Sequence, residues 1–341
     1  MRKVDLSKYQ IRTDLVVDLI EDNSSFEKKR KYKNIVISNI SLDNDSSLKL
    51  NKSPGDYTTI YFEDVTDNTS FEDVLSVFTE ELSLMLENTG ISDNASCMIV
   101  GLGNENSTAD ILGVNSAKGV TVTKHIYDLV GSLESGYRVC SCLIPGVMGT
   151  TGIETSEIIN SVVSATKPDF IIAIDALASD SLDRLLKTIQ ITNTGINPGS
   201  GIGNNRIGLN SSSLNIPVIA IGVPTVVDAT TIVNDTINYM KKHFSYNIKN
   251  KDKLSMKLIP SSKINYLVNN PYNLSKDESS YFLGMIGTLS DIEKRMFIND
   301  VLSPIGFNMI VTPKEIDFVV LKLANLISSG INKTIHNVST K

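Results

Sequence analysis

Two aspartates that follow apolar, strand-like segments are the residues best placed for chemistry. Asp175 comes directly after five apolar residues, 170–174, a run typical of a strand buried on both faces of a parallel sheet. Asp110 ends the polar loop that follows a second such strand, 97–102. Ligands of open α/β sheets collect beyond the carboxyl ends of the strands, so we expect both carboxylates over the same sheet edge. The alternative is that these aspartates only cap helices.

Two carboxylates at one sheet edge could share a proton and divide acid and base work between them. One would act as a base towards water, while the other polarises a carbonyl group or protonates a leaving amine. The sequence contains neither Gly-x-Ser-x-Gly nor His-Glu-x-x-His, which weakens the serine-hydrolase and zinc-protease hypotheses. The histidines, His125, His243 and His336, have no metal-ligand spacing. We therefore expect neither a metal site nor a cofactor.

Two glycine-containing loops are candidates for shaping a substrate site. Gly146 and Gly149 follow a predicted strand, and Gly199 and Gly201 lie in a second loop, 198–206. Glycine has no Cβ atom, so a peptide backbone can approach it closely. For the first loop the alternative is a plain tight turn. The second loop contains Gly-x-Gly-x-Gly, whose spacing is not that of the dinucleotide-binding fingerprint.

The order of the predicted elements indicates an α/β fold. Strand-like segments alternate with helical patterns, which is typical of a mostly parallel sheet with helices on both faces. We expect a single domain over 15–341, with a small strand addition at about 34–64 and an irregular excursion at about 245–276. The predicted strands are 97–102, 137–144, 169–174, 188–192 and 216–221, and the predicted helices are 70–88, 151–167, 279–290, 291–302 and 313–329.

The first 33 residues are polar, with a run of charges at 27–31. Such a segment is expected to form an exposed arm with little core of its own. Within it, Asp14 precedes the apolar residues 15–17. A flexible segment in which an acidic residue meets an apolar run is a good protease substrate.

Composition restricts the class of protein and its partners. The chain has 341 residues, of which 41% are hydrophobic and 21% charged, and a net charge of −6. An acidic balance offers no footprint for nucleic acid, and no run approaches the ~18 apolar residues of a membrane span. The N-terminus lacks the apolar core of a signal peptide, so we expect a cytoplasmic protein. Cys97, Cys140 and Cys142 lie in apolar runs, as reduced structural thiols do.

Several long motifs, in order, resemble those of the germination protease (spore protease) family of endospore-forming bacteria. They are 145–149 with 151–155, 169–178, 216–229 and 283–289. The resemblance extends from Asp5 to about His336. It implies an endopeptidase of the spore core or forespore that hydrolyses small acid-soluble spore proteins during germination and assembles as a homotetramer.

The resemblance also implies roles for particular residues. The two catalytic aspartates of the family match Asp110 and Asp175. The family is made as a zymogen that cleaves its own propeptide, and its junction matches 11–15, which places the cut between Asp14 and Leu15 and makes 1–14 the propeptide. The loop 107–114 departs from the family pattern because it lacks the prolines often found there.

Two alternatives to a paired-carboxylate peptidase stay open. The family fold is similar to that of the hydrogenase maturation proteases, which use a metal, although the spore protease is not thought to need one. A metal-dependent protease would use the same two aspartates and a further ligand. A non-catalytic protein that binds spore proteins would use the aspartates only as helix caps.

Overall fold

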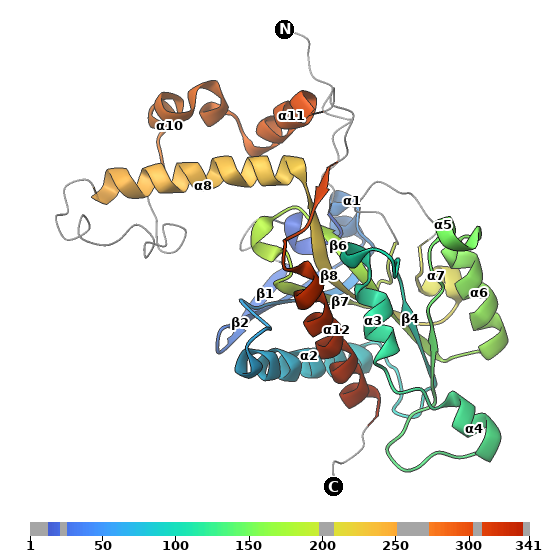
Figure 1. Cartoon of the computed structure of the whole chain (residues 1–341). Coiled ribbons are helices and arrows are strands. Elements are labelled where there is room, and N and C mark those ends of the chain that lie inside the picture. Colours follow the sequence, from blue (N-terminus) through green and yellow to red (C-terminus); the bar gives the residue numbers. More distant parts are fainter. Residues whose placement is uncertain (1–12, 21–25, 198–207, 251–272, 303–308, 337–341) are drawn as a thin grey trace. The chain divides into compact units, whose positions relative to one another are not determined.

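The computed structural model describes residues 13–20, 26–197, 208–250, 273–302 and 309–336, and Figure 1 shows their elements. The chain divides into two compact units. The larger comprises 12–226 and 312–341, and the smaller comprises 227–311 together with 1–11. The two predicted aspartates both belong to the larger unit.

A mixed sheet forms the centre of the fold. Its strands lie in the order β1-β2-β3-β7-β8-β6-β4-β5, and β9 pairs with the end of β8. The sheet is open, because β1 and β5 lie at its two ends. The strands are β1 (Glu27–Tyr32), β2 (Ile35–Leu42), β3 (Gly55–Tyr61), β4 (Cys97–Gly101), β5 (Cys140–Leu143), β6 (Phe170–Ser179), β7 (Thr188–Thr192), β8 (Val218–Asp228) and β9 (Ile310–Val311).

The prediction of a mostly parallel sheet was not right. Strand β4 is parallel to both β5 and β6, whereas the pairs β1–β2, β2–β3, β3–β7 and β7–β8 are all antiparallel. Only two residues, Lys33 and Asn34, connect β1 to β2. A parallel connection needs a dozen or more residues, so this one can only make a hairpin.

Helices cover both faces of the sheet, which confirms the α/β class. On one face, α2 (Asn68–Asn88), α3 (Leu112–Lys118) and α12 (Ile316–Ile335) share a core with Ile172 and Ile174 of β6. On the other face, residues of α6 (Thr155–Thr166) and α7 (Ser211–Leu214) pack against Ile171 and Ala173 of the same strand. Successive side chains of a strand point to opposite faces, so an uninterrupted apolar run serves both cores.

The N-terminal segment is packed rather than exposed. Leu15, Val16 and Val17 are buried in a third cluster with residues of β2 and β3 and with Leu177. The charged run 27–31 lies in the edge strand β1, whose residues after Glu27 are exposed. The expectation of an exposed arm was therefore wrong for 15–17, because these three apolar residues pack against the sheet.

Other elements begin or end away from their predicted limits. The predicted helix 151–167 begins later, as α6 at Thr155, and a separate short helix, α5 (Met148–Thr151), precedes it. Gly152, between the two helices, has a left-handed φ of 72°. Such a residue ends a helix. The other helices that the structure describes in the larger unit are α1 (Asn44–Leu50), α4 (Lys124–Val130) and the 3-10 turns η2 (Val16–Asp18), η3 (Thr108–Asp110) and η4 (Leu182–Arg184).

The smaller unit contains mostly helices. The helices described there are α8 (Ala229–Asn250), α10 (Lys276–Leu283), the 3-10 turn η7 (Gly284–Thr288) and α11 (Asp291–Leu302). The buried ammonium of Lys294 in α11 donates to Asn238 Oδ1 of α8 at 2.7 Å and pairs with Asp291. The expected excursion at about 245–276 begins inside α8, and 251–272 lie outside the described residues.

Candidate active site

Asp175 lies inside β6 rather than at its end. The strand continues to Ser179, and the side chain of Asp175 is only 6% exposed. Asp175 Oδ1 accepts a hydrogen bond from the N–H of Ala176 at 2.9 Å. The sequence suggested a strand end because an aspartate follows five apolar residues. A residue in the interior of a strand does not cap a helix, so the capping alternative does not apply to Asp175.

Asp110 closes the loop that follows β4. It is the last residue of η3, and its Oδ2 atom accepts from the N–H of Asn104 at 2.8 Å. Its own N–H donates to Ser107 O at 2.9 Å. Gly103 has a φ of 112°, and a Cβ atom added there would lie 1.9 Å from Asp110 O. The loop that presents Asp110 therefore requires glycine at this position.

Backbone contacts place the loop of Asp110 beside the strand that carries Asp175. Gly101 of β4 is in register with Ile174 of β6, and Leu102 N–H donates to Ile174 O at 2.8 Å. Asp175, the next residue of β6, therefore lies beside the carboxyl end of β4, where the loop to Asp110 begins. The other side of that loop is held by Thr225 of β8, whose fully buried hydroxyl donates to Ala109 O at 2.6 Å.

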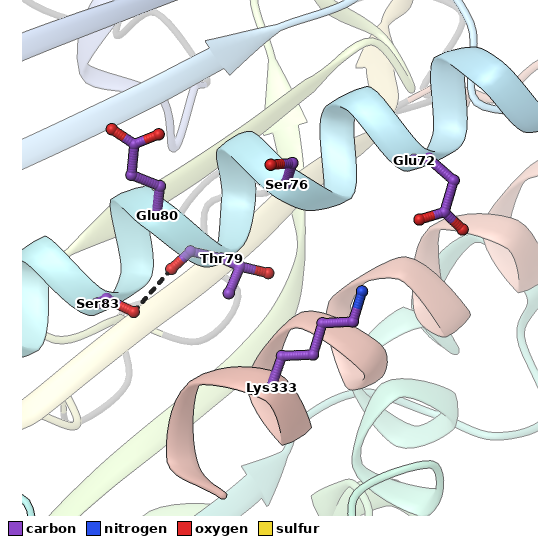
Figure 2. Close-up of a pocket in the computed structure, with 6 residues that line it drawn as sticks. All are labelled: Glu72, Ser76, Thr79, Glu80, Ser83 and Lys333. Atoms are coloured by element: carbon purple, nitrogen blue, oxygen red, sulfur yellow. Dashed lines mark hydrogen bonds between the residues drawn. The ribbon is translucent and has the colours of Figure 1, made fainter. Parts of the chain in front are cut away.

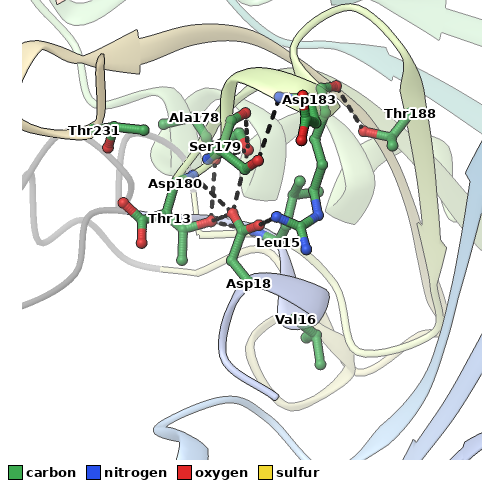
Figure 3. A network of polar contacts seen from close by, with 12 residues as sticks. Thr13, Leu15, Val16, Asp18, Ala178, Ser179, Asp180, Asp183, Thr188 and Thr231 are labelled. Atoms are coloured by element: carbon green, nitrogen blue, oxygen red, sulfur yellow. Dashed lines mark hydrogen bonds and ion pairs between the residues drawn. The ribbon is translucent and has the colours of Figure 1, made fainter. Parts of the chain in front are cut away.

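The predicted cleavage junction lies along the same strand. Asp14 N–H donates to Ala178 O at 3.0 Å, and Ala178 N–H donates to Asp14 Oδ2 at 2.9 Å. Ala178 is three residues after Asp175 in β6. Leu15, on the other side of the junction, is 0% exposed. Figure 3 shows Thr13 and Leu15 beside this end of β6.

A lysine that the sequence did not indicate contacts the junction. Lys52 Nζ donates to Asp14 O at 3.0 Å and to Thr13 O at 3.2 Å. Burial lowers the pKa of this ammonium, and the carboxylates of Asp14 and Asp18 oppose the shift. Lys52 follows the short helix α1 in a polar connection. No sequence pattern distinguishes it from the other lysines.

The glycines expected to shape a substrate site are only partly described. Gly146 has a left-handed φ of 72° and its carbonyl accepts from Thr155 Oγ1 at 3.2 Å. Gly149 is exposed within α5. Gly199 and Gly201 lie outside the described residues. A role for these loops in substrate binding stays a prediction.

His336, the most buried of the three histidines, connects separate segments of the fold. The ring of His336 accepts at Nδ1 from the N–H of Arg138 at 3.3 Å, and its Nε2 lies 3.0 Å from Thr121 O. Its ring also lies 5.3 Å from that of Tyr137. These contacts fasten the end of α12 to the segments on both sides of α4. Among the described residues, no group of three or more histidine, cysteine or carboxylate side chains could hold a metal ion.

The cysteines lie in the parallel part of the sheet. Cys97 and Cys140 are register partners on β4 and β5, and all three cysteines are free thiols in the described structure. Burial raises the pKa of Cys97 well above its ordinary value, and it raises the pKa of Cys142 to about 11. A thiol with a raised pKa is a poor nucleophile at neutral pH.

One hollow lies away from the two aspartates, between α2 and the end of α12 (Figure 2). It has a volume of about 480 Å³ and is lined by hydroxyl and charged groups. The lining residues are Glu72, Ser76, Thr79, Glu80, Ser83 and Lys333. They belong to the helical layer, so the hollow is not part of the sheet edge that holds Asp110 and Asp175.

Comparison with known proteins identifies the family. A family model described as germination protease matches residues 15–341. The chain belongs to the germination protease family. Germination proteases of Bacillus thuringiensis subsp. konkukian (strain 97-27) and Bacillus cereus (strain 03BB102) are each 44% identical to it, over 354 and 355 aligned residues, and each alignment covers 98% of this chain and 96% of the relative. A germination protease of Bacillus anthracis (strain CDC 684 / NRRL 3495) is 44% identical over 355 residues.

Membership of the germination protease family makes the chain a peptidase of spore germination. The resemblance inferred from the sequence motifs is thereby confirmed. Within the ranges that the structure describes, no helix is both long and apolar enough to cross a membrane.

Proposed function

We propose that this germination protease is an endopeptidase that degrades small acid-soluble spore proteins, with Asp110 and Asp175 as its catalytic pair. The observation that carries the proposal is the register of β4 and β6. Because Gly101 pairs with Ile174, Asp175 and the loop to Asp110 meet at one end of the sheet. Ligands of α/β sheets collect at such ends.

In the proposed mechanism the two carboxylates take opposite protonation states. Like charges held close together cannot both ionise easily, so one carboxylate keeps its proton while the other loses it. The ionised carboxylate removes a proton from water, which attacks the peptide carbonyl carbon. The protonated carboxylic acid then donates its proton to the leaving nitrogen.

The chain is further proposed to be a zymogen that cleaves itself between Asp14 and Leu15 and so loses residues 1–14. Two observations support this junction. The segment is hydrogen-bonded to Ala178, close along β6 from Asp175, and the family match begins at residue 15. The substrates are proposed to be cut after an acidic and before a large apolar residue, as at Asp14–Leu15.

The cellular setting is also part of the proposal. The chain is proposed to act in the spore core as a homotetramer, without binding nucleic acid or a membrane. The resemblance to the family and the acidic net charge of −6 support this setting. Sedimentation of the purified chain would test the oligomeric state directly.

The decisive experiment measures cleavage of a small acid-soluble spore protein by a chain that begins at Leu15. Asp175→Asn and Asp110→Asn should each lower the cleavage rate at least about 100-fold, because each removes one partner of acid–base catalysis. Asp169→Asn is the matched control, since Asp169 lies just before β6 at its other end and is bonded to Ser96. This control should keep full activity.

Chelator and binding measurements separate the alternatives. Activity that survives chelation supports the paired carboxylates, whereas loss of activity on chelation supports a metal-dependent protease. If the folded chain binds the spore protein without cutting it, the protein is a binding module. Full activity in Asp175→Asn would overturn the proposed catalytic pair.

A further inference from the structure

Asp18, the last residue of η2, has a buried carboxylate that contacts the end of β6. Its side chain is 1% exposed, and its Oδ1 atom lies 2.7 Å from Arg184 Nη1. The other oxygen, Oδ2, accepts from the N–H of Asp180 at 2.8 Å and from Ser179 Oγ at 3.3 Å. Figure 3 shows Asp18 directed towards Ser179 and Asp180. The two oxygens therefore have separate sets of partners.

Thr13 links this carboxylate to the nitrogen of Leu15. The Thr13 hydroxyl donates to Asp18 Oδ2 and accepts from Leu15 N–H at 3.1 Å. Thr13 lies on the propeptide side of the proposed junction, and both Leu15 and Asp18 lie on the other side. One hydroxyl that would leave with the propeptide thus stands between the Leu15 nitrogen and a buried anion.

Contacts that do not involve the propeptide hold Leu15 in place. Its side chain packs with Ile40, Tyr57 and Leu177. The next residue is also fixed, because Val16 N–H donates to Gln190 Oε1 at 3.0 Å. The position of the Leu15 nitrogen therefore does not depend on residues 1–14 alone.

Hydrolysis of the Asp14–Leu15 bond would change the charge at this position. Water supplies the oxygen that converts the Asp14 carbonyl to a carboxylate, and its hydrogens allow the Leu15 nitrogen to become a primary amine, which is protonated at neutral pH. A buried ammonium is costly unless it has a counter-ion and hydrogen-bond acceptors. Asp18 Oδ2 is the anion to which Thr13 already connects this nitrogen.

We propose that Asp18 is the binding site for the α-ammonium of Leu15 in the processed chain, where this ammonium replaces the Thr13 hydroxyl. The inference rests on the proposed junction between Asp14 and Leu15. Asp18 would then bind Arg184 through Oδ1 and the new terminus through Oδ2. Since Asp18 also binds Ser179 and Asp180, the pair would tie the new terminus to the end of the strand that carries Asp175.

The test compares the thermal stability of four chains. Two begin at Met1 and two begin at Leu15, and one of each carries Asp18→Asn. All four carry Asp175→Asn to prevent self-cleavage, and an added protease that cuts a fused tag generates the Leu15 terminus. Asp18→Asn should lower the melting temperature of both forms, because Arg184 loses its partner. The decrease should be larger by roughly 2–4 °C in the chain that begins at Leu15.

Two controls make the result specific. Asp56→Asn removes a carboxylate of β3 that accepts from Ser41 Oγ at 2.6 Å, and its effect should not depend on where the chain begins. A chain with one glycine added before Leu15 should lose only the additional stability, roughly 2–4 °C in melting temperature, because the ammonium is displaced while Asp18 keeps its ion pair with Arg184. Equal decreases in the Met1 and Leu15 chains would overturn the proposal.

Failure of this test is distinguishable from failure of the proposed function. The Leu15 terminus is made by an added protease, so the stability comparison is informative even if the chain never cleaves itself. Conversely, equal decreases would leave the roles of Asp110 and Asp175 untouched, because the cleavage assay measures those separately.

Discussion

Gly113 at the start of α3 lies directly against Ile174 of β6. A Cβ atom added to Gly113 would be 2.2 Å from Ile174 O and 2.4 Å from Leu102 O. Both neighbours are backbone atoms, one in β6 and one directly after β4, so they cannot rotate away as a side chain could. The absence of a side chain at Gly113 therefore allows the helix, the loop to Asp110 and the strand of Asp175 to meet.

Gly113→Ala should disturb both stability and activity. The added methyl group forces α3 away from β4 and β6, with an expected loss of roughly 1–3 kcal/mol in the free energy of unfolding. Urea unfolding measures this loss, and cleavage of a spore protein should slow because Asp110 moves with the helix. Gly149→Ala is the matched control for the stability measurement, since no described atom lies within 4 Å of a Cβ at that position. Equal behaviour of the two variants would contradict the prediction.

Lys52→Met should slow self-cleavage of the full chain. The ammonium that binds the carbonyl oxygens of Thr13 and Asp14 would stabilise the negative charge that develops on Asp14 O during attack. Loss of a comparable donor lowers rates about 100-fold. The time course of conversion of full chain to processed chain measures the effect.

A chain that begins at Leu15 shows whether the effect of Lys52→Met is specific to self-cleavage. In a chain that begins at Leu15, Lys52→Met should leave cleavage of an added spore protein within about two-fold, because its contacts are to the propeptide. Lys49→Met, on the exposed surface of α1, should alter neither reaction. Self-cleavage at an unchanged or higher rate in Lys52→Met would show that the lysine only holds the segment.

His336 should make the stability of the fold depend on pH. Burial lowers its pKa, the hydrogen bond with Thr121 opposes this, and the nearby charge of Arg138 lowers it further. The unfolded chain therefore takes up the proton at a higher pH than the folded chain does. The stabilisation is fully present above about pH 6.5, the ordinary histidine value, and is lost as pH falls through the lower folded pKa.

This pH dependence can be measured by urea unfolding at pH 7.5 and pH 5. His336→Gln should lower the free energy of unfolding at pH 7.5. It should also make the fall in this free energy from pH 7.5 to pH 5 smaller than the fall in the wild type. His125→Gln changes an exposed residue of α4 and should retain the wild-type decrease. An unchanged pH dependence in His336→Gln would refute the assignment.

Cys142 should react slowly with alkylating reagents in the folded chain. With a pKa of about 11, about one thiol in a thousand is ionised at pH 8, and only the thiolate is a nucleophile. Mass spectrometry after timed exposure to iodoacetamide would follow the modification. The same residue in urea should react far faster, and rapid labelling of the folded chain would contradict the raised pKa.

The sequence allowed the strands of the parallel part of the sheet to be predicted, but not the full length of β6. The apolar run 170–174 is visible as a buried strand, yet β6 extends to Ser179. The residues after Ile174 include Asp175 and Ser179, which interrupt the apolar run, and Asp14, more than 160 residues away, is the hydrogen-bond partner of Ala178. Pairing of this kind depends on the tertiary fold and leaves no local pattern.

Prediction of the candidate site was limited in the same way, by contacts that form only in the tertiary fold. Asp110 and Asp175 could be selected because each follows a recognisable apolar run in the sequence. Lys52 and Asp18 could not be, because their importance comes from contacts with residues that are distant in the sequence. The ion pair between Asp18 and Arg184 joins a segment expected to be an exposed arm to a 3-10 turn, and neither has a distinctive composition.

The basic residues of β1 have a consequence for how copies of the chain can associate. Four consecutive cationic side chains, 28–31, are exposed on the strand that ends the sheet. An unprotected edge strand offers free backbone groups to any other strand, and lysines there discourage such pairing. Two copies that approached through this edge would bring like charges together. The sheet is therefore protected at β1 against growth from molecule to molecule, the route by which open sheets polymerise into fibres.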